Sequence, residues 1–323
     1  MLRERPLGLQ ARARGARAVS AAPTGTIRIG TRGSELARTQ TGLVARELEK
    51  RGATTELVII STEGDRSDAP LASLGGAGVF VAALREALLD GRVDVAVHSL
   101  KDLPTAPAPG LSIGAIPKRA DARDALCARD GLTLQTLPEG ARVGTGSPRR
   151  VAQLRSRRPD LEIVDVRGNV DTRLGRVASG ELDAVVLAVA GLDRIGRLDA
   201  VSEFLELGPW PTAPGQGALA VEVRAGEEKL VSALDHKTSR VTAEAERRTL
   251  ALLEAGCSAP VAAHAVVDDG LLFLSARVYG PEHHITSSHA LYVSDSKDPA
   301  GDLAERVAKE LFELGAADLI GAP

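Results

Sequence analysis

The chain has few cysteines, few aromatic residues and no long apolar run, and each shortage argues against a class of protein. Its 323 residues include two cysteines, Cys127 and Cys257, and aromatic residues make up 2%. Two cysteines cannot form a disulfide framework and neither lies in a CxxC pair, so a reducing compartment, the cytoplasm, is expected. So few aromatic side chains do not suit a base-stacking surface. No apolar run reaches the about 18 residues that cross a bilayer, so no membrane association is expected.

Charge and metal-ligand patterns are also missing. The net charge is -3, whereas a general nucleic-acid binder is usually basic, so no nucleic-acid partner is expected. No Cys/His cluster has the spacing of a zinc site, and no metal is predicted. The apolar share of 44% is that of an ordinary soluble globular protein, and the length predicts two or three domains.

The first 25 residues are rich in Arg and Ala and lack a hydrophobic segment. This composition excludes a classical secretory signal. A disordered extension over residues 1–25 is the prediction, and a transit peptide is the alternative with the same composition.

Three times the chain passes from a short strand through a turn into a helix. In the first unit, strand 27–30 leads to helix 35–50, with Ser34 as N-cap and Gly52 after its end. In the second, strand 141–144 leads to a helix that starts after the N-cap Ser147 and ends near 158. In the third, strand 162–166 leads to a helix that closes at Gly180.

The remaining strands predict the fold class. Near-continuous apolar runs at 57–60, 93–97, 183–189 and 218–223 indicate parallel sheets covered on both faces. Residues 261–293 instead predict a three-stranded antiparallel meander, covered by a helix at 303–314. The prediction is two α/β domains, one over 26–117 with 218–236 and one over 118–217, followed by a small α+β domain over 237–323.

Arginines recur at the strand-to-helix turns. A helix N-terminus favours anions, and a guanidinium group grips a carboxylate through two hydrogen bonds. One such arginine alone is more often a solvated surface charge, but their shared position predicts a ligand with several carboxylates or phosphates. The residues concerned are Arg32, Arg149, Arg150, Arg167 and Arg173.

A polar segment follows the apolar strand 93–97. It begins at His98 and includes Lys101 and Asp102, at the strand end where α/β sheets place ligands. A carboxylate there can stabilise a cation and pass a proton to a leaving amine. Local pairing of Asp102 with Lys101 explains the pattern equally well, and His98 alone is more often structural.

The two cysteines differ in their surroundings. Cys257 follows a helix over 242–254 and lies in a loop, where a thiol is available for covalent chemistry. An inert role for Cys257 stays open on this evidence. Cys127 lies within an apolar run and fits an inert role.

The motifs, taken together and in order, resemble the hydroxymethylbilane synthase (porphobilinogen deaminase) family. The resemblance covers nearly everything after residue 25, and each piece alone is weak while the set is specific. It is carried by residues 29–34, Gly64-Asp65-Arg66, residues 98–104, Ser147-Pro148-Arg149-Arg150, Arg167-Gly168-Asn169, residues 214–218 and Gly256-Cys257.

The resemblance implies an enzyme that joins four porphobilinogen molecules head to tail into hydroxymethylbilane, with release of ammonia, in haem biosynthesis. It implies a dipyrromethane cofactor attached to Cys257 and a catalytic Asp102. It also implies two domains like type II periplasmic binding proteins, and a monomer. Cofactor-binding residues would be Arg32, Ser34, Lys101, Ser147, Arg149, Arg150, Arg167 and Arg173; substrate-binding residues would be Arg32, Arg167, Arg173, Arg194 and Gln216.

The chain departs from the family in its lid loop, which often carries lysines. Residues 73–79 here contain Gly75, Gly76 and Gly78 and no lysine. Backbone mobility and free N–H groups are predicted to supply the lid function, and an ordinary connector is the alternative. Gly146 also stands where the family commonly has serine.

Two other functions fit the predicted architecture. A solute receptor would need neither Asp102 nor Cys257, and it would be exported, although no export signal is visible. A regulatory domain that binds a small anion would be flanked by a DNA-binding module, and none is visible.

Overall fold

The structure is a computed structural model that describes residues 25–61, 78–255 and 259–320. The predicted N-terminal extension, most of the predicted lid loop and Cys257 lie outside these residues. No helix in the described ranges is both long enough and apolar enough to span a bilayer.

The first sheet has five strands in the order β2-β1-β3-β10-β4. Its strand β10 arrives from more than 100 positions further along the chain, so this unit is discontinuous in sequence. Helix α1 (Glu35–Glu49) begins at Ser34, whose side chain accepts a hydrogen bond from the Ala37 N–H as an N-cap does. Helix α3 is Gly78–Leu89, and the strands are β1 (Thr26–Thr31), β2 (Thr54–Ile59), β3 (Val95–Ser99), β4 (Leu111–Ala115) and β10 (Leu219–Arg224).

The second sheet also has five strands, in the order β7-β6-β8-β5-β9. Helix α5 begins at Asn169, whose side chain accepts from the Thr172 N–H, whereas Ser147 at the start of α4 makes no such bond. The strands are β5 (Asp124–Ala128), β6 (Arg142–Gly144), β7 (Glu162–Val164), β8 (Ala184–Ala188) and β9 (Glu203–Leu205), and the helices are α4 (Pro148–Arg157), α5 (Val170–Ala178) and α6 (Val189–Arg194).

Both sheets are mixed, which corrects the expectation of parallel sheets. Strand β10 runs antiparallel to β3 and β4, and β5 runs antiparallel to β8 and β9. The apolar run 218–223 indicated burial on both faces, and β10 is buried, but burial does not determine strand direction. Direction follows from the side on which the chain re-enters the sheet.

The expectation of a buried strand at 57–60 was also wrong. Strand β2 lies at the edge of its sheet, and the side chains of Leu57 and Ile59 are 41% and 59% exposed. Helix α3 packs over β1, β3 and β10. Because that helix is centred on the middle of the sheet, it leaves the edge strand partly uncovered.

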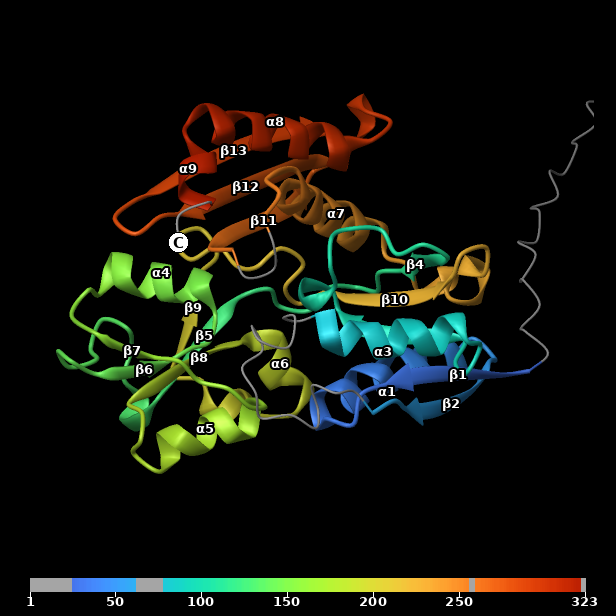
Figure 1. Ribbon diagram of the computed structural model, residues 1–323, viewed down its shortest axis with the longest axis horizontal. Coiled ribbons are helices and arrows are strands. Elements are labelled where there is room, and N and C mark those ends of the chain that lie inside the picture. Colours follow the sequence, from blue (N-terminus) through green and yellow to red (C-terminus); the bar gives the residue numbers. More distant parts are fainter. Residues whose placement is uncertain (1–24, 62–77, 256–258, 321–323) are drawn as a thin grey trace, which may run out of the picture.

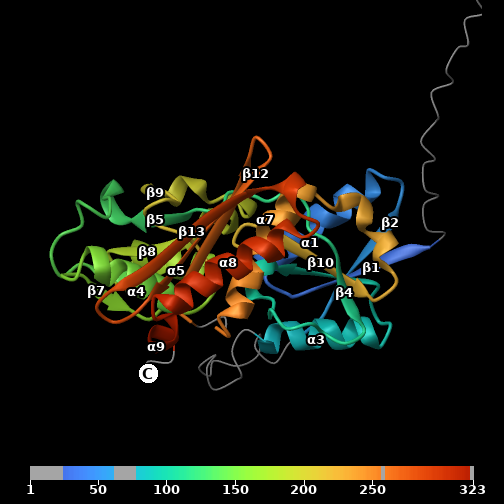
Figure 2. The ribbon, with the colours of Figure 1, turned by 90° about the horizontal axis from the view of Figure 1, so that it is seen from above.

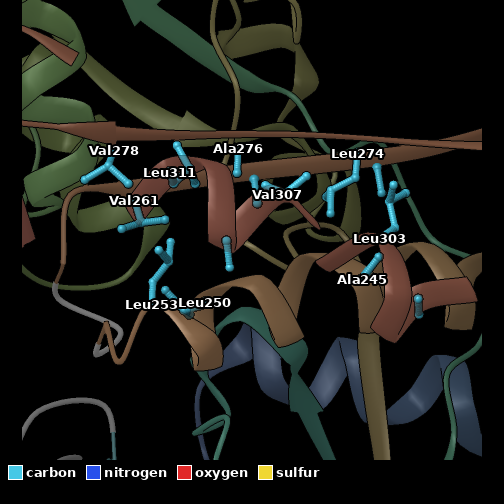
Figure 3. Close-up of a cluster of buried hydrophobic side chains, with 14 of the residues drawn as sticks. Ala245, Leu250, Leu253, Val261, Leu274, Ala276, Val278, Leu303, Val307 and Leu311 are labelled. Carbon is cyan, nitrogen blue, oxygen red and sulfur yellow. The ribbon is translucent and has the colours of Figure 1, made fainter. Parts of the chain in front are cut away.

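The third unit confirms the predicted antiparallel meander. Strands β11 (Val261–Asp268), β12 (Leu271–Tyr279) and β13 (His284–Tyr292) pair in that order. The first hairpin turns at Asp269 and Gly270, both with positive φ, as a tight two-residue turn requires. Helices α7 (Lys237–Leu252) and α8 (Pro299–Glu313) cover one face through apolar contacts that include Leu250, Leu274 and Leu303 (Figure 3). Helix α9 (Ala316–Ile320) follows.

Two chain segments connect the first two units and lie side by side. The backbone at Gly217 lies next to residues 120–121, and the Ala120 N–H donates to Gly217 O at 3.3 Å. Gly217 has φ +86°, and a Cβ there would lie 2.7 Å from Ala120 O, so only glycine fits this crossing. The third unit lies over the junction of the other two (Figures 1 and 2). The domain boundaries given above stay predictions.

Candidate active site

The residues predicted to bind the ligand follow the carboxyl ends of parallel strands. Strands β1 and β3 are parallel neighbours, so the turn after β1 and the 3₁₀ turn Leu100–Asp102 lie at one edge of the first sheet. Strands β6, β7 and β8 are likewise parallel, and Ser147, Arg167 and Arg194 follow them. This is the edge at which α/β sheets bind ligands.

Lys101 links the two units electrostatically. Its Nζ donates to Gln216 Oε1 at 3.3 Å. The pKa of Lys101 is lowered to about 8, chiefly by burial and also by the nearby Arg150 and Arg149, while Asp102 and Asp124 oppose the shift. The protonation of Lys101, in the first unit, therefore depends on Arg149 and Arg150 of the second unit.

Asp124, at the start of β5, is a buried carboxylate on which four side-chain donors converge, and we call it the buried hub. Its carboxylate is fully buried and accepts hydrogen bonds from Arg149 Nη2 at 2.9 Å and Arg150 Nη2 at 2.6 Å. Trp210 Nε1 donates at 2.9 Å and Gln216 Nε2 at 2.8 Å. The two guanidinium groups hold the pKa of Asp124 far below its usual range despite burial. A carboxylate so paired stays ionised.

Arg149 and Arg150 are turned towards this hub. Both are more than 90% buried, and their remaining donors also reach protein carbonyls, such as Val186 O at 2.9 Å from Arg150 Nη1. Their predicted direct grip on ligand carboxylates stays a prediction. Arg149 Nε is nevertheless a buried donor without a hydrogen-bond partner among the described residues, which is unusual in a folded protein.

The site carries more positive than negative charge. Arg173, on α5, has a lowered pKa because it is partly buried and lies near Arg150, while Asp165 and Asp102 oppose that shift. The connected set holds five cationic groups and three carboxylates among the described residues, so positive charge predominates. The cations are Lys101, Arg149, Arg150, Arg167 and Arg173, and the carboxylates are Asp102, Asp124 and Asp165.

Other predicted binding residues lie around this set. Arg194 Nη2 donates to Gly217 O at 2.7 Å, and burial lowers the pKa of Arg194 to about 10. Ser34 caps α1. The Gln216 side chain has no exposed surface, so here it supports its neighbours, and its predicted contact with substrate stays a prediction. Arg32 follows β1 and is partly buried, and Arg167 is exposed.

Asp102 faces solvent, as does Asp165, which lies 3.7 Å from Arg167 Nε. The backbone of its turn is fixed by Leu100 and Leu103, which are at most 1% exposed. Asp102 makes no hydrogen bond or ion pair with another described side chain, whereas Asp124 is saturated with donors. A carboxylate held in this way can interact with a charged reactant.

Only one of the two cysteines, Cys127, lies among the described residues. Cys127 is 2% exposed on β5, and burial raises the pKa of its thiol to about 12, so it is inert as expected. The position of Cys257 lies outside the described residues, and its covalent role stays a prediction. Among the described residues, no cluster of three or more His, Cys, Asp or Glu side chains could hold a metal ion.

Sequence reasoning missed Asp124 and a second buried carboxylate, Glu246 on α7. Glu246 accepts two hydrogen bonds from Arg119, at 2.7 and 2.9 Å, and one from the Gly215 N–H at 2.7 Å. The pKa of Glu246 falls to about 2 because Arg119 outweighs burial. An acid within an apolar strand was the available signal for Asp124, since buried charges are rarely unpaired.

Family models match almost the whole described chain. One described as "Porphobilinogen deaminase, dipyromethane cofactor binding domain" matches residues 27–232. One described as "Porphobilinogen deaminase, C-terminal domain" matches residues 240–313.

Curated relatives are similar over nearly their full length. A porphobilinogen deaminase of Leifsonia xyli subsp. xyli is 58% identical over 91% of this chain and 94% of the relative. One of Mycobacterium bovis is 55% identical over 91% of this chain and 98% of the relative.

Two solved structures show a distant likeness. The periplasmic VFT2 domain of Bordetella pertussis BvgS is 17% identical, with a TM-score of 0.39, over 65% of this chain and 85% of that chain. A periplasmic sulfonate-binding protein from Methylobacillus flagellatus is 18% identical, with a TM-score of 0.37, over 71% of this chain and 69% of that chain. The sequence relatives carry the assignment, and by them this chain belongs to the porphobilinogen deaminase family.

Proposed function

We propose that this chain joins four porphobilinogen molecules head to tail into hydroxymethylbilane, releasing one ammonia for each molecule added. The observation that carries the proposal is the excess of cationic side chains around an accessible carboxylate. Porphobilinogen and its oligomers carry acetate and propionate groups, so each added unit brings two carboxylates. Family membership supplies the substrate, and the charge distribution supplies a reason for its binding.

The described residues fit a polycarboxylate cofactor. A dipyrromethane bound through Cys257 supplies the primer to which new pyrrole units are joined. Its carboxylates would be held by Lys101, Arg173, Arg167, Ser147, Ser34 and Arg32, with Arg149 and Arg150 contributing positive charge from the buried hub. The unpartnered Arg149 Nε is the kind of donor that such a ligand satisfies.

Asp102 performs two tasks in this proposal. When the C–N bond of porphobilinogen breaks, the protonated amino group leaves as ammonia with the bonding electron pair, and the Asp102 carboxylate stabilises the positive charge that remains on the pyrrole. When the new C–C bond forms, a proton leaves the attacked pyrrole carbon, and Asp102 can accept it. Asp124 engages Arg149 and Arg150 and so keeps these two guanidinium groups from pairing with Asp102.

The covalent attachment is tested by Cys257→Ser. A hydroxyl is a far poorer nucleophile than a thiolate, so the variant should fold but carry no cofactor and form no product. Intact-mass measurement of the purified wild type should show the excess mass of two pyrrole units, and the variant should show none. Cys127→Ser is the matched control and should keep the added mass.

A receptor function makes the opposite forecast. It requires binding of a small anion without covalent mass on Cys257 and without ammonia release. Normal product formation by Cys257→Ser, or wild type of unmodified mass that releases no ammonia from porphobilinogen, would contradict the proposal.

Carboxylate binding should weaken as pH rises through about 8, because Lys101 loses its proton there and is charged only below its pKa. The apparent KM for porphobilinogen, measured from below to above pH 8, should rise in the alkaline range. In Lys101→Arg this rise should be absent, since a guanidinium group stays protonated throughout. An identical alkaline rise in both proteins would show that another group titrates.

The cellular setting follows from the same assignment. A cytoplasmic monomer is proposed, and the buried free thiol of Cys127 suits the reducing conditions of that compartment. Size-exclusion chromatography with light scattering tests the monomer.

A further inference from the structure

The turn that carries Asp102 is held by a side chain from the third unit. Arg247, on α7, donates from Nη1 to Leu100 O at 3.1 Å and to Leu103 O at 2.7 Å. Its Nη2 donates to Pro104 O at 2.8 Å. A single guanidinium group thus gathers three carbonyls of residues 100–104.

This contact supplies hydrogen-bond donors to backbone carbonyls of the turn. The 3₁₀ turn Leu100–Asp102 contains one internal bond at its end, from Leu103 N–H to Leu100 O. A short helical turn leaves its last carbonyls without donors of its own. The planar fork of arginine presents several N–H groups in a fixed geometry, so it can satisfy adjacent carbonyls and fix their relative direction.

The other contacts of the turn involve its apolar side chains and the Leu100 N–H. Leu100 and Leu103 are buried in an apolar cluster that includes Ala243 of α7. The Leu100 N–H donates to Ala218 O at 3.0 Å. Gly215 packs so closely that a Cβ there would lie 3.1 Å from Leu100 Cγ. Apolar packing therefore holds Leu100 and Leu103 in the core, and the guanidinium group holds the direction of the turn's carbonyls.

We propose that Arg247 is a positioning residue for the reaction, which acts by fixing the backbone that directs the Asp102 side chain. The proposal rests on the proposed catalytic role of Asp102. Arg247 itself binds main-chain carbonyls of the turn. Its effect on the reaction passes through the geometry of Asp102, and a small misplacement of a reacting group can lower a rate by a large factor.

The direct test is Arg247→Met, which keeps much of the side-chain length and removes every N–H donor. Turnover at saturating porphobilinogen should fall by roughly 10-fold or more, while KM and the cofactor mass stay near those of the wild type. Arg247→Lys keeps the charge but cannot span three carbonyls, so its turnover should lie between the two. If Arg247→Met does not fold, the turnover of Arg247→Lys provides the test.

A matched control lies two turns earlier on the same helix. Arg240 is also partly buried and also donates to a main-chain carbonyl of the first unit, Ile113 O at 3.2 Å, besides binding Asp235. Arg240→Met should lower thermal stability without lowering turnover below the melting temperature. Equal loss of turnover in the Arg240 and Arg247 variants would overturn the proposal, since the effect would then be general loosening of α7.

A double variant separates positioning from stability. If Arg247 acts through Asp102, then Arg247→Met combined with Asp102→Asn should turn over no more slowly than Asp102→Asn alone. Fully multiplicative losses would overturn the inference. Normal turnover by Arg247→Met while Asp102→Asn is impaired would also overturn it and leave the proposed function intact. Normal turnover by Asp102→Asn would instead contradict the catalytic assignment on which it rests.

Discussion

Replacing Asp102 by asparagine is expected to lower turnover by about 100-fold or more while the cofactor mass is retained. The amide has nearly the same size, but it carries no negative charge and accepts no proton. General acid–base groups typically contribute about 10²- to 10⁴-fold, and a 100-fold loss corresponds to about 2.7 kcal/mol of barrier. Ammonia release and product formation under saturating porphobilinogen measure the effect, and intact mass measures the cofactor.

The position of Asp102 explains why stability should hardly change. The side chain is exposed and has no hydrogen-bonded partner among the described side chains, while the turn is held by Leu100, Leu103 and Arg247. Asp90→Asn, which makes the same change in an exposed carboxylate paired with Arg92, is the control and should turn over normally. A loss below about tenfold in Asp102→Asn, or about 1.4 kcal/mol, would assign the chemistry to another residue.

Replacing Asp124 by asparagine is expected to destabilise the fold by about 3–5 kcal/mol, because removing one partner from a buried ion pair leaves uncompensated charge. Here two buried guanidinium groups lose the same counter-ion. The introduced amide would also direct an N–H group at donors. Urea unfolding followed by circular dichroism measures the free energy, and Asp90→Asn should change it by less than about 0.5 kcal/mol.

Asp124→Asn should also impair the site, which distinguishes it from ordinary destabilisation. Gln216 bridges Asp124 and Lys101, so release of the hub frees the Lys101 ammonium group as well as Arg149 and Arg150. Cofactor content, measured by intact mass at a temperature where the variant is folded, should fall below that of the wild type. A variant with wild-type stability and full cofactor content would show that the arginines are held by their carbonyl contacts alone.

Local patterns in the sequence predicted much of the architecture. The predicted cap at Ser34 and the predicted antiparallel meander depend on residues close along the chain, so their physical causes are visible there. The cap bond expected from the Ser147 side chain is not made. The placement of Lys101, Asp102, Ser147 and Arg167 after strands could also be predicted, because a strand end is a local feature. The motifs, taken together, also indicated the family to which the chain belongs.

By itself, then, the sequence determined the secondary-structure units, the residue types at the strand ends and the family. The tertiary structure decided which groups meet. Strand β10 returns antiparallel, Arg149 and Arg150 turn inward to Asp124, and Arg247 holds the turn of Asp102 from about 145 positions away. A side chain's partner depends on the path of the backbone between distant segments, and local propensity contains no information about that path. The direction of a buried arginine is therefore a property of the fold, whereas its presence at a turn is a property of the sequence.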